Sequence, residues 1–189
     1  MKKREDTFMK KQEKKSLDTK PKRQRIVIGS IVEIPIDGKY FVYAQILYDG
    51  GYAFFDYRSS ESISDLSVLE HTSVLFIVAV YDYVIHKNIW RIVGKLPVRE
   101  ELKAQPMEYI YDRITDRFSL YNPNTGKVIP TTKDKARGLE RAAVWGDNHI
   151  EDRIRDYYNN VPCIWLKDHY RLFPESVPKI GGSDSEIGG

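Results

Sequence analysis

Residues 52–96 read YAFFDYRSSESISDLSVLEHTSVLFIVAVYDYVIHKNIWRIVGKL. The segment is dense in β-branched and aromatic residues, which are enriched in strands because they pack well on a pleated surface. Residues 74–80 (VLFIVAV) are apolar throughout, as is typical of a strand covered on both faces. No apolar run reaches the roughly 20 residues that a membrane helix needs. The segment therefore predicts the core strands of a mostly β domain, in which residues 89–93 pair with residues 74–80.

A hairpin is predicted just before this segment. Residues 31–36 and 39–48 are rich in apolar side chains and are separated by Asp37-Gly38. An Asp-Gly pair between apolar runs favours a two-residue turn with positive φ at both positions. Pro35 has no N–H to donate, which predicts that the first strand lies at a sheet edge there.

Helical spacing occurs mainly in the C-terminal half. Ile150, Ile154 and Tyr157 share one face of a predicted helix that begins at Asp147 or Asn148 and ends at about Tyr158. On that helix, the residues expected to face water are Glu151, Arg153 and Arg155. Residues 163–166 (CIWL) predict a closing strand. Strands first and helices late indicate a mostly β or α+β fold, a curled antiparallel sheet with a few short helices towards the C-terminal half. The sequence does not decide whether this sheet closes into a barrel.

Charge divides the chain into a basic arm and a mildly acidic remainder. Residues 1–25 hold eleven Lys or Arg and four Asp or Glu, whereas the remainder holds 19 basic and 23 acidic residues. We predict that residues 1–25 form a disordered basic arm, residues 26–173 a single β-rich domain, and residues 174–189 a flexible tail. The single cysteine excludes an internal disulfide and fits a reducing compartment. With no visible signal peptide, the expected location is the cytoplasm.

No residue pattern points to catalysis, and we predict no catalytic residue, cofactor or metal. The four histidines (His71, His86, His149 and His169) lack the spacing of a helical ligand pair. Cys163 lies in an apolar run, where burial makes a thiol inert. GxSxG, GxGxxG and GxxxxGK[ST] motifs are absent from the sequence.

Several acidic residues lie within or beside predicted core elements, and a buried carboxylate needs a partner. They are Glu33, Asp56, Asp82 and Glu140, and their candidate partners are Arg58, Arg91 and Arg141. Structural ion pairs are one interpretation, and carboxylates lining a cleft are the other. Thirteen tyrosines, seven phenylalanines and three tryptophans exceed what a core of this size must hide, which favours protein binding.

The middle of the chain resembles the immunity protein 26 family over about residues 26–165. The matching blocks are GSIVEIPI (29–36), DGKY (37–40), YAFFDYR (52–58), VLFIVAV (74–80), Trp90 with VGKLP (93–97), GLERAAVW (138–145) and IEDRI (150–154). The resemblance implies a mostly β bacterial immunity protein of a polymorphic-toxin or contact-dependent-inhibition system. Such a protein binds a cognate toxin domain and blocks it by occlusion. The long basic arm departs from the family pattern.

An acidic partner would be steered toward a basic toxin cleft, and a nuclease toxin is one candidate. The residues first expected to contact it are Asp56, Asp82, Tyr83, Glu140 and Glu151. One alternative is a metal-dependent phosphotriester hydrolase, because some family members carry a phosphotriesterase label. A second is a nucleic-acid-binding module that uses the basic arm.

Overall fold

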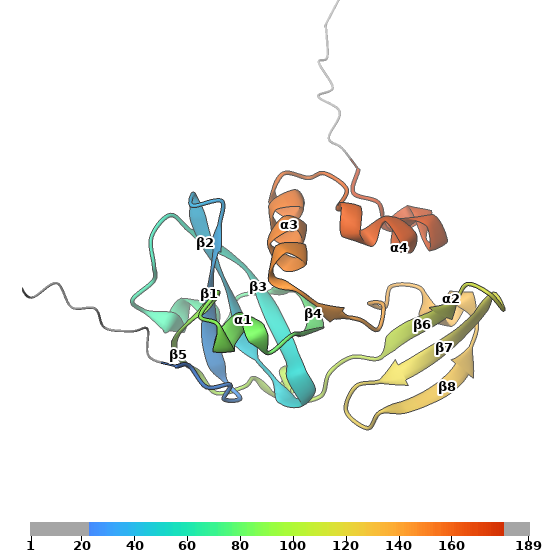
Figure 1. The fold of residues 1–189 in the computed structure, drawn as a ribbon, viewed down its shortest axis with the longest axis horizontal. Helices are drawn as coiled ribbons and strands as arrows, with labels where there is room; N and C mark the ends of the chain where they lie inside the picture. Colours follow the sequence, from blue (N-terminus) through green and yellow to red (C-terminus); the bar gives the residue numbers. More distant parts are fainter. Residues whose placement is uncertain (1–22, 180–189) are drawn as a thin grey trace, which may run out of the picture.

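The computed structural model describes residues 23–179, which form two β-sheets and several short helices (Figure 1). Most of the predicted basic arm and most of the predicted tail, residues 1–22 and 180–189, lie outside the described residues. The mostly β or α+β fold class is confirmed, with nine strands among the described residues. No described helix is long and apolar enough to cross a membrane.

The larger sheet has six strands in the order β5-β1-β2-β3-β4-β9. Their bounds are β1 Ser30–Ile36, β2 Tyr40–Ile46, β3 Gly51–Ser59, β4 Val74–Val80, β5 Arg91–Lys95 and β9 Val144–Trp145. All neighbours are antiparallel except β4 and β9, which are parallel. Register shifts interrupt three of the pairings, and such bulges bend and twist a sheet. The sheet stays open, with β5 and β9 at its two ends.

The predicted hairpin is confirmed, because β1 pairs with β2 through a turn in which Asp37 has φ 52° and Gly38 φ 66°. The edge prediction for Pro35 is wrong for the strand as a whole, since β1 lies between β5 and β2. The pairing with β5 ends at Glu33, however, so Pro35 has a neighbour on one side only. Residues 89–93 do not pair with β4 as predicted; β5 pairs with β1 instead.

The smaller sheet has three antiparallel strands, β6 Glu108–Asp112, β7 Arg117–Asn122 and β8 Lys127–Thr131. One of its faces packs Tyr109 and Phe118 against Phe173, which directly follows α4 (Lys167–Leu172). Helix α2 (Lys133–Ala136) adds the buried Ala136 to the same cluster. Backbone bonds from Tyr109 N–H to Glu140 and from Ala142 N–H to Tyr109 connect β6 to the chain that leads into β9.

The main core lies between the six-stranded sheet and the helices α1 (Tyr83–His86) and α3 (Asp147–Tyr158). Ile150 and Ile154 of α3 pack there against side chains of the sheet and the fully buried Trp90, as the helical spacing predicted. The strand predicted for residues 163–166 is wrong. Ile164–Leu166 form a 3-10 helix that continues into α4, with Ile164 and Trp165 exposed.

Candidate interaction surface

The start of helix α3 is tied to helix α1 by a close approach at Gly146. A Cβ at Gly146 would lie 2.9 Å from the Tyr83 hydroxyl oxygen, so the residue type leaves room for the tyrosine. That hydroxyl donates to Asp147 Oδ1 at 2.6 Å, in the first turn of α3. Two short elements that are distant in sequence therefore present one continuous surface.

This surface carries a line of ring-bearing side chains, which we call the aromatic strip: Tyr81, Tyr83, His149 and Trp165. The Tyr81 and Tyr83 rings are stacked, with centroids 5.9 Å apart. The His149 ring is also a neighbour of Gly146, and its centroid lies 3.9 Å from that of Trp165. The aromatic strip thus runs from the end of β4, across the N-terminus of α3, to the 3-10 helix before α4.

Two rings of the aromatic strip are anchored by carboxylates of α3. Tyr83 is bonded to Asp147, and Trp165 Nε1 donates to Asp152 Oδ2 at 2.8 Å. Trp165 is still 44% exposed, and Tyr81, which stacks on the anchored Tyr83, is 51% exposed. Exposed rings that are already fixed lose little side-chain entropy when they bind, which is the property of a binding anchor.

Negative charge predominates around the aromatic strip, although Arg155 forms an ion pair with Asp152 at 2.6 Å. Residues 81–83 and 144–152 contain four carboxylates and no Lys or Arg. Lys87, from the end of α1, places its Nζ 5.3 Å from the Tyr83 ring centroid. The surface therefore combines aromatic faces with negative charge, a combination that attracts cations.

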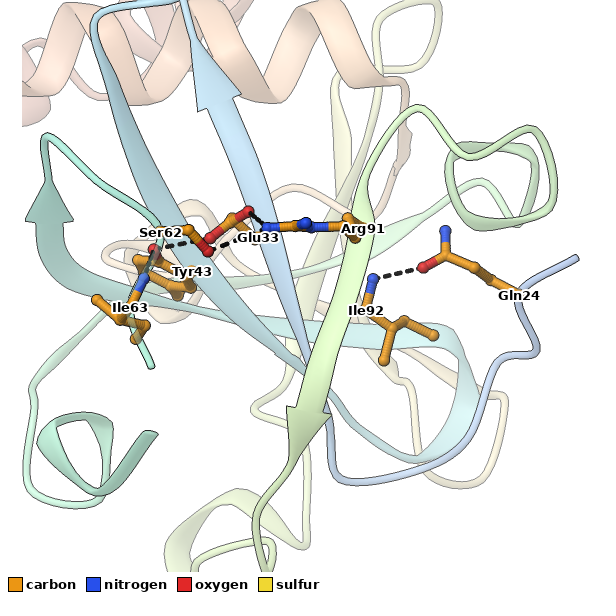
Figure 2. Close-up of polar contacts among 7 residues, drawn as sticks. All are labelled: Gln24, Glu33, Tyr43, Ser62, Ile63, Arg91 and Ile92. Carbon is orange, nitrogen blue, oxygen red and sulfur yellow. Dashed lines mark hydrogen bonds and ion pairs between the residues drawn. The ribbon is translucent and has the colours of Figure 1, made fainter. Parts of the chain in front are cut away.

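A second polar cluster surrounds Glu33 in the six-stranded sheet, and Figure 2 shows its geometry. Glu33 is only 3% exposed. The Tyr43 hydroxyl donates to its Oε2 at 3.0 Å, and Arg91 Nη2 donates to its Oε1 at 2.6 Å. Arg91 also donates to Ser62 Oγ at 3.0 Å, and the Tyr43 hydroxyl accepts from the Ile63 N–H at 3.0 Å.

The Glu33 cluster has the chemistry of a structural anchor. Burial, assisted by the neighbouring Glu33, raises the pKa of Tyr43 to about 12, so its hydroxyl keeps its proton and donates it. Both carboxylate oxygens of Glu33 are occupied by side chains of the protein. The cluster connects β1, β2 and β5 to residues 62–63, which confirms Glu33 and Arg91 as a structural ion pair.

Two further cavities lie outside the Glu33 cluster. One of about 530 Å³ is lined by residues of β7, β8 and α2, among them Arg117 and Lys133. The other, of about 130 Å³, is lined by Arg153, Cys163 and apolar side chains. Burial raises the pKa of the Cys163 thiol, so it stays protonated and unreactive. Within residues 23–179, no group of three or more His, Cys, Asp and Glu side chains could hold a metal ion.

Comparison with known proteins gives one match. The model of the family described as Immunity protein 26 matches residues 27–120, about half of the chain. This segment belongs to the immunity protein 26 family. No curated protein and no solved structure gives a significant match. The family match spans β1 to β5 and continues through β6 into β7, so it includes Tyr81 and Tyr83 but not α3.

Three of the five residues expected to contact a partner lie at or beside the aromatic strip: Asp82, Tyr83 and Glu151. Asp82 is exposed at the start of α1. Glu151 accepts a hydrogen bond from Trp90 Nε1 at 2.9 Å, and burial raises its pKa. The expectation that Glu151 faces water is therefore wrong, because an indole donor holds it against the core.

The other two residues expected to contact a partner, Asp56 and Glu140, lie elsewhere in this immunity protein 26 relative. Asp56 accepts hydrogen bonds from the hydroxyls of Tyr157 and Tyr158, each at 3.2 Å, at the C-terminal end of α3. Glu140 accepts two hydrogen bonds from Arg153, at 2.6 and 3.0 Å.

The water-facing predictions also fail for Arg153. Its guanidinium carbon lies 3.8 Å from the Phe76 ring centroid, and its partner is Glu140, although Arg153 was not among the three arginines considered as partners of the acidic residues. Arg153 lies three residues after Ile150, on a side of α3 that faces the protein. There its guanidinium group contacts Phe76, Trp145 and Glu140.

Sequence reasoning missed Tyr81, His149 and Trp165. Trp165 was assigned to a strand and His149 was considered as a metal ligand, and only the fold brings their rings together. The Tyr-Asp-Tyr sequence at residues 81–83 was the one available signal, because it places two aromatic rings and an acid at the end of an apolar strand.

Proposed function

We propose that this protein protects a bacterial cell by binding a cognate protein toxin and covering part of the toxin's surface. The family match over residues 27–120 carries this proposal. The protein acts by binding rather than by catalysis, in the cytoplasm of the cell that produces the toxin. Residues 26–173 form the domain that binds.

The anchored, half-exposed rings of the aromatic strip support a binding role. Aromatic side chains contribute much of the energy of protein interfaces, because they bury a large area with few rotatable bonds.

Co-expression tests the proposal. The toxin encoded beside this gene is induced in a bacterial host, with or without this protein, and surviving cells are counted. We expect survival only when the protein is present. An Ile34→Asp variant, which places a charge in the fully buried core, is the control, because it should not fold and should not protect. Equal killing with and without the wild-type protein would refute the proposed function.

A purified pair then separates binding from other forms of protection. The toxin's C-terminal domain should form a stable complex with this protein in calorimetry, and its activity should fall in proportion to the fraction bound. Loss of toxin activity without a complex would contradict occlusion.

A further inference from the structure

We propose that the aromatic strip is the face that contacts the toxin, and that it receives a lysine- or arginine-rich segment of the toxin domain. This inference rests on the proposed function and adds the location of the interface and the chemistry of the partner.

The first argument is the state of the rings before binding. Tyr83 and Trp165 are fixed by Asp147 and Asp152, and Tyr81 is stacked on Tyr83. Val144 and Ile164, both exposed, add apolar area from the residues next to Trp145 and Trp165. A partner that covers this surface removes apolar area from water without having to order the side chains that contact it.

The second argument is the sign of the partner's charge. Residues 81–83 and 144–152 hold four carboxylates. Asp152 is paired with Arg155, whereas Asp82, Asp147 and Glu151 form no salt bridge within the described residues, so the surface still attracts a cationic partner. Lys87 already lies over one face of Tyr83, which shows that a cation fits against these rings. Within the part of the chain that the structure describes, no lysine or arginine lies over Tyr81 or Trp165. These two rings are free to receive cations from a partner.

The third argument is a contrast with the C-terminal end of the same helix. There the Arg58 guanidinium carbon lies 4.7 Å from the Tyr158 ring centroid, and the Tyr157 and Tyr158 hydroxyls both donate to Asp56. The rings and the acid at that end are already paired with groups of the protein itself. The Tyr158 ring therefore has less to gain from a cationic partner than Tyr81 and Trp165, over which no lysine or arginine of the described residues lies.

The experiment measures the dissociation constant of the purified toxin domain, the same domain used in the co-expression test. Tyr81→Ala and Trp165→Ala should each weaken binding about tenfold or more. Tyr81→Lys should weaken binding further, because it places a cation where the partner's cations must lie. The matched controls are Tyr157→Ala, a tyrosine of equal exposure at the other end of α3, and Asp56→Asn, and both should leave binding within about twofold.

Charge is tested separately through kinetics. Asp82→Asn should slow association about threefold at low salt and should reduce the salt dependence of association, with little change in dissociation. Asp56→Asn should leave the association rate unchanged. An equal effect of Asp82→Asn and Asp56→Asn would show that the whole surface, and not the aromatic strip, steers the partner, and would overturn the charge argument.

The outcomes keep the two proposals apart. If the wild-type protein protects cells while Tyr81→Ala, Tyr81→Lys and Trp165→Ala bind as tightly as it does, the inference is wrong and the proposed function stands. If the wild-type protein neither protects nor binds, the proposed function itself fails. A melting curve for each variant checks folding. Should Trp165→Ala melt early, the two changes at Tyr81 decide the result, because that ring is exposed and its hydroxyl donates no hydrogen bond within the described residues.

Discussion

Each sheet of this molecule buries one glutamate, and the two glutamates have opposite surroundings. Glu33, in the six-stranded sheet, is 3% exposed and receives hydrogen bonds from Arg91 and Tyr43. Glu108, at the start of β6 in the three-stranded sheet, is 5% exposed. Its pKa is raised to about 7, first by burial and then by the nearby charge of Glu140, and neither cause is a hydrogen bond.

The difference shows that burial alone does not decide what a carboxylate contributes. The carboxylate of Glu33 is bonded to Arg91 and Tyr43, and these contacts hold β1, β2 and β5 to residues 62–63. Glu108 can remain inside the protein most easily when it is protonated. The three-stranded sheet is therefore expected to weaken as Glu108 loses its proton.

The largest expected effect comes from Glu108→Gln. The folded pKa of Glu108, about 7, lies above the ordinary 4.5, so its stabilising contribution is complete below pH 4.5 and is lost as pH rises through 7. At about 1.4 kcal/mol per pH unit, the wild type should lose roughly 2 to 3 kcal/mol relative to Glu108→Gln between pH 5 and pH 8. Urea unfolding of both proteins at the two pH values measures this difference.

Comparison with the variant isolates Glu108 from His169, whose pKa is lowered mainly by burial and which titrates in both proteins. If the stability of the wild type and of Glu108→Gln depended on pH in the same way, burial would not disfavour the charged form of Glu108. The contrast with Glu33 would then disappear.

The Glu33 cluster also shows what the sequence could and could not predict. Glu33 was recognised as an acid that needs a partner, and Arg91 as one of three candidate partners, but the sequence did not pair them. The contribution of Tyr43 was not visible, since it depends on the register that places Tyr43 opposite Glu33 in β2. Glu108 was not singled out, because its burial is produced by the packing of the small sheet and not by an apolar run.

The same distinction applies to the fold and the aromatic strip. The Asp37-Gly38 turn and helix α3 were predictable, because both depend on residues a few positions apart. The pairing of β5 with β1 and the contact of His149 with Trp165 join distant segments that no local pattern specifies. Residues 163–166 looked like a strand because they are apolar, yet only Cys163 is buried.

Arg91→Ala is expected to have the next largest effect, about 2 kcal/mol of lost stability at pH 7, because it leaves the Glu33 charge buried with a single hydroxyl donor. Arg91 is itself 64% exposed, so the loss should fall below that of a fully buried pair. Adding Glu33→Gln to this variant should recover part of the loss, since the remaining group is then neutral. Equal stability of the single and double variants in urea would mean that the buried charge is not the cause.

Gln24→Ala should destabilise the protein by about 1 kcal/mol. The Gln24 side chain lies along β5, where its Oε1 accepts from the Ile92 N–H at 2.5 Å (Figure 2). Its Nε2 donates to the Trp90 carbonyl at 2.8 Å. It thus satisfies backbone groups at the edge of the sheet, beside the strand that carries Arg91. Hydrogen exchange at Ile92 should accelerate in the variant. Arg23→Ala, an exposed neighbour, should leave both stability and exchange unchanged.

Ser62→Ala should have the smallest effect, within about 0.5 kcal/mol, because its bond to Arg91 lies at the exposed rim of the Glu33 cluster. The measurement still decides how the cluster works. If the buried half, Glu33 with Tyr43, holds the cluster together, Arg91 keeps its position without Ser62 and unfolding in urea barely changes. A loss of stability as large as that of Arg91→Ala would instead mean that Arg91 stabilises the protein mainly by fixing residues 62–63. Its hydrogen bond to Glu33 would then contribute little, and the surroundings of Glu33 would resemble those of Glu108.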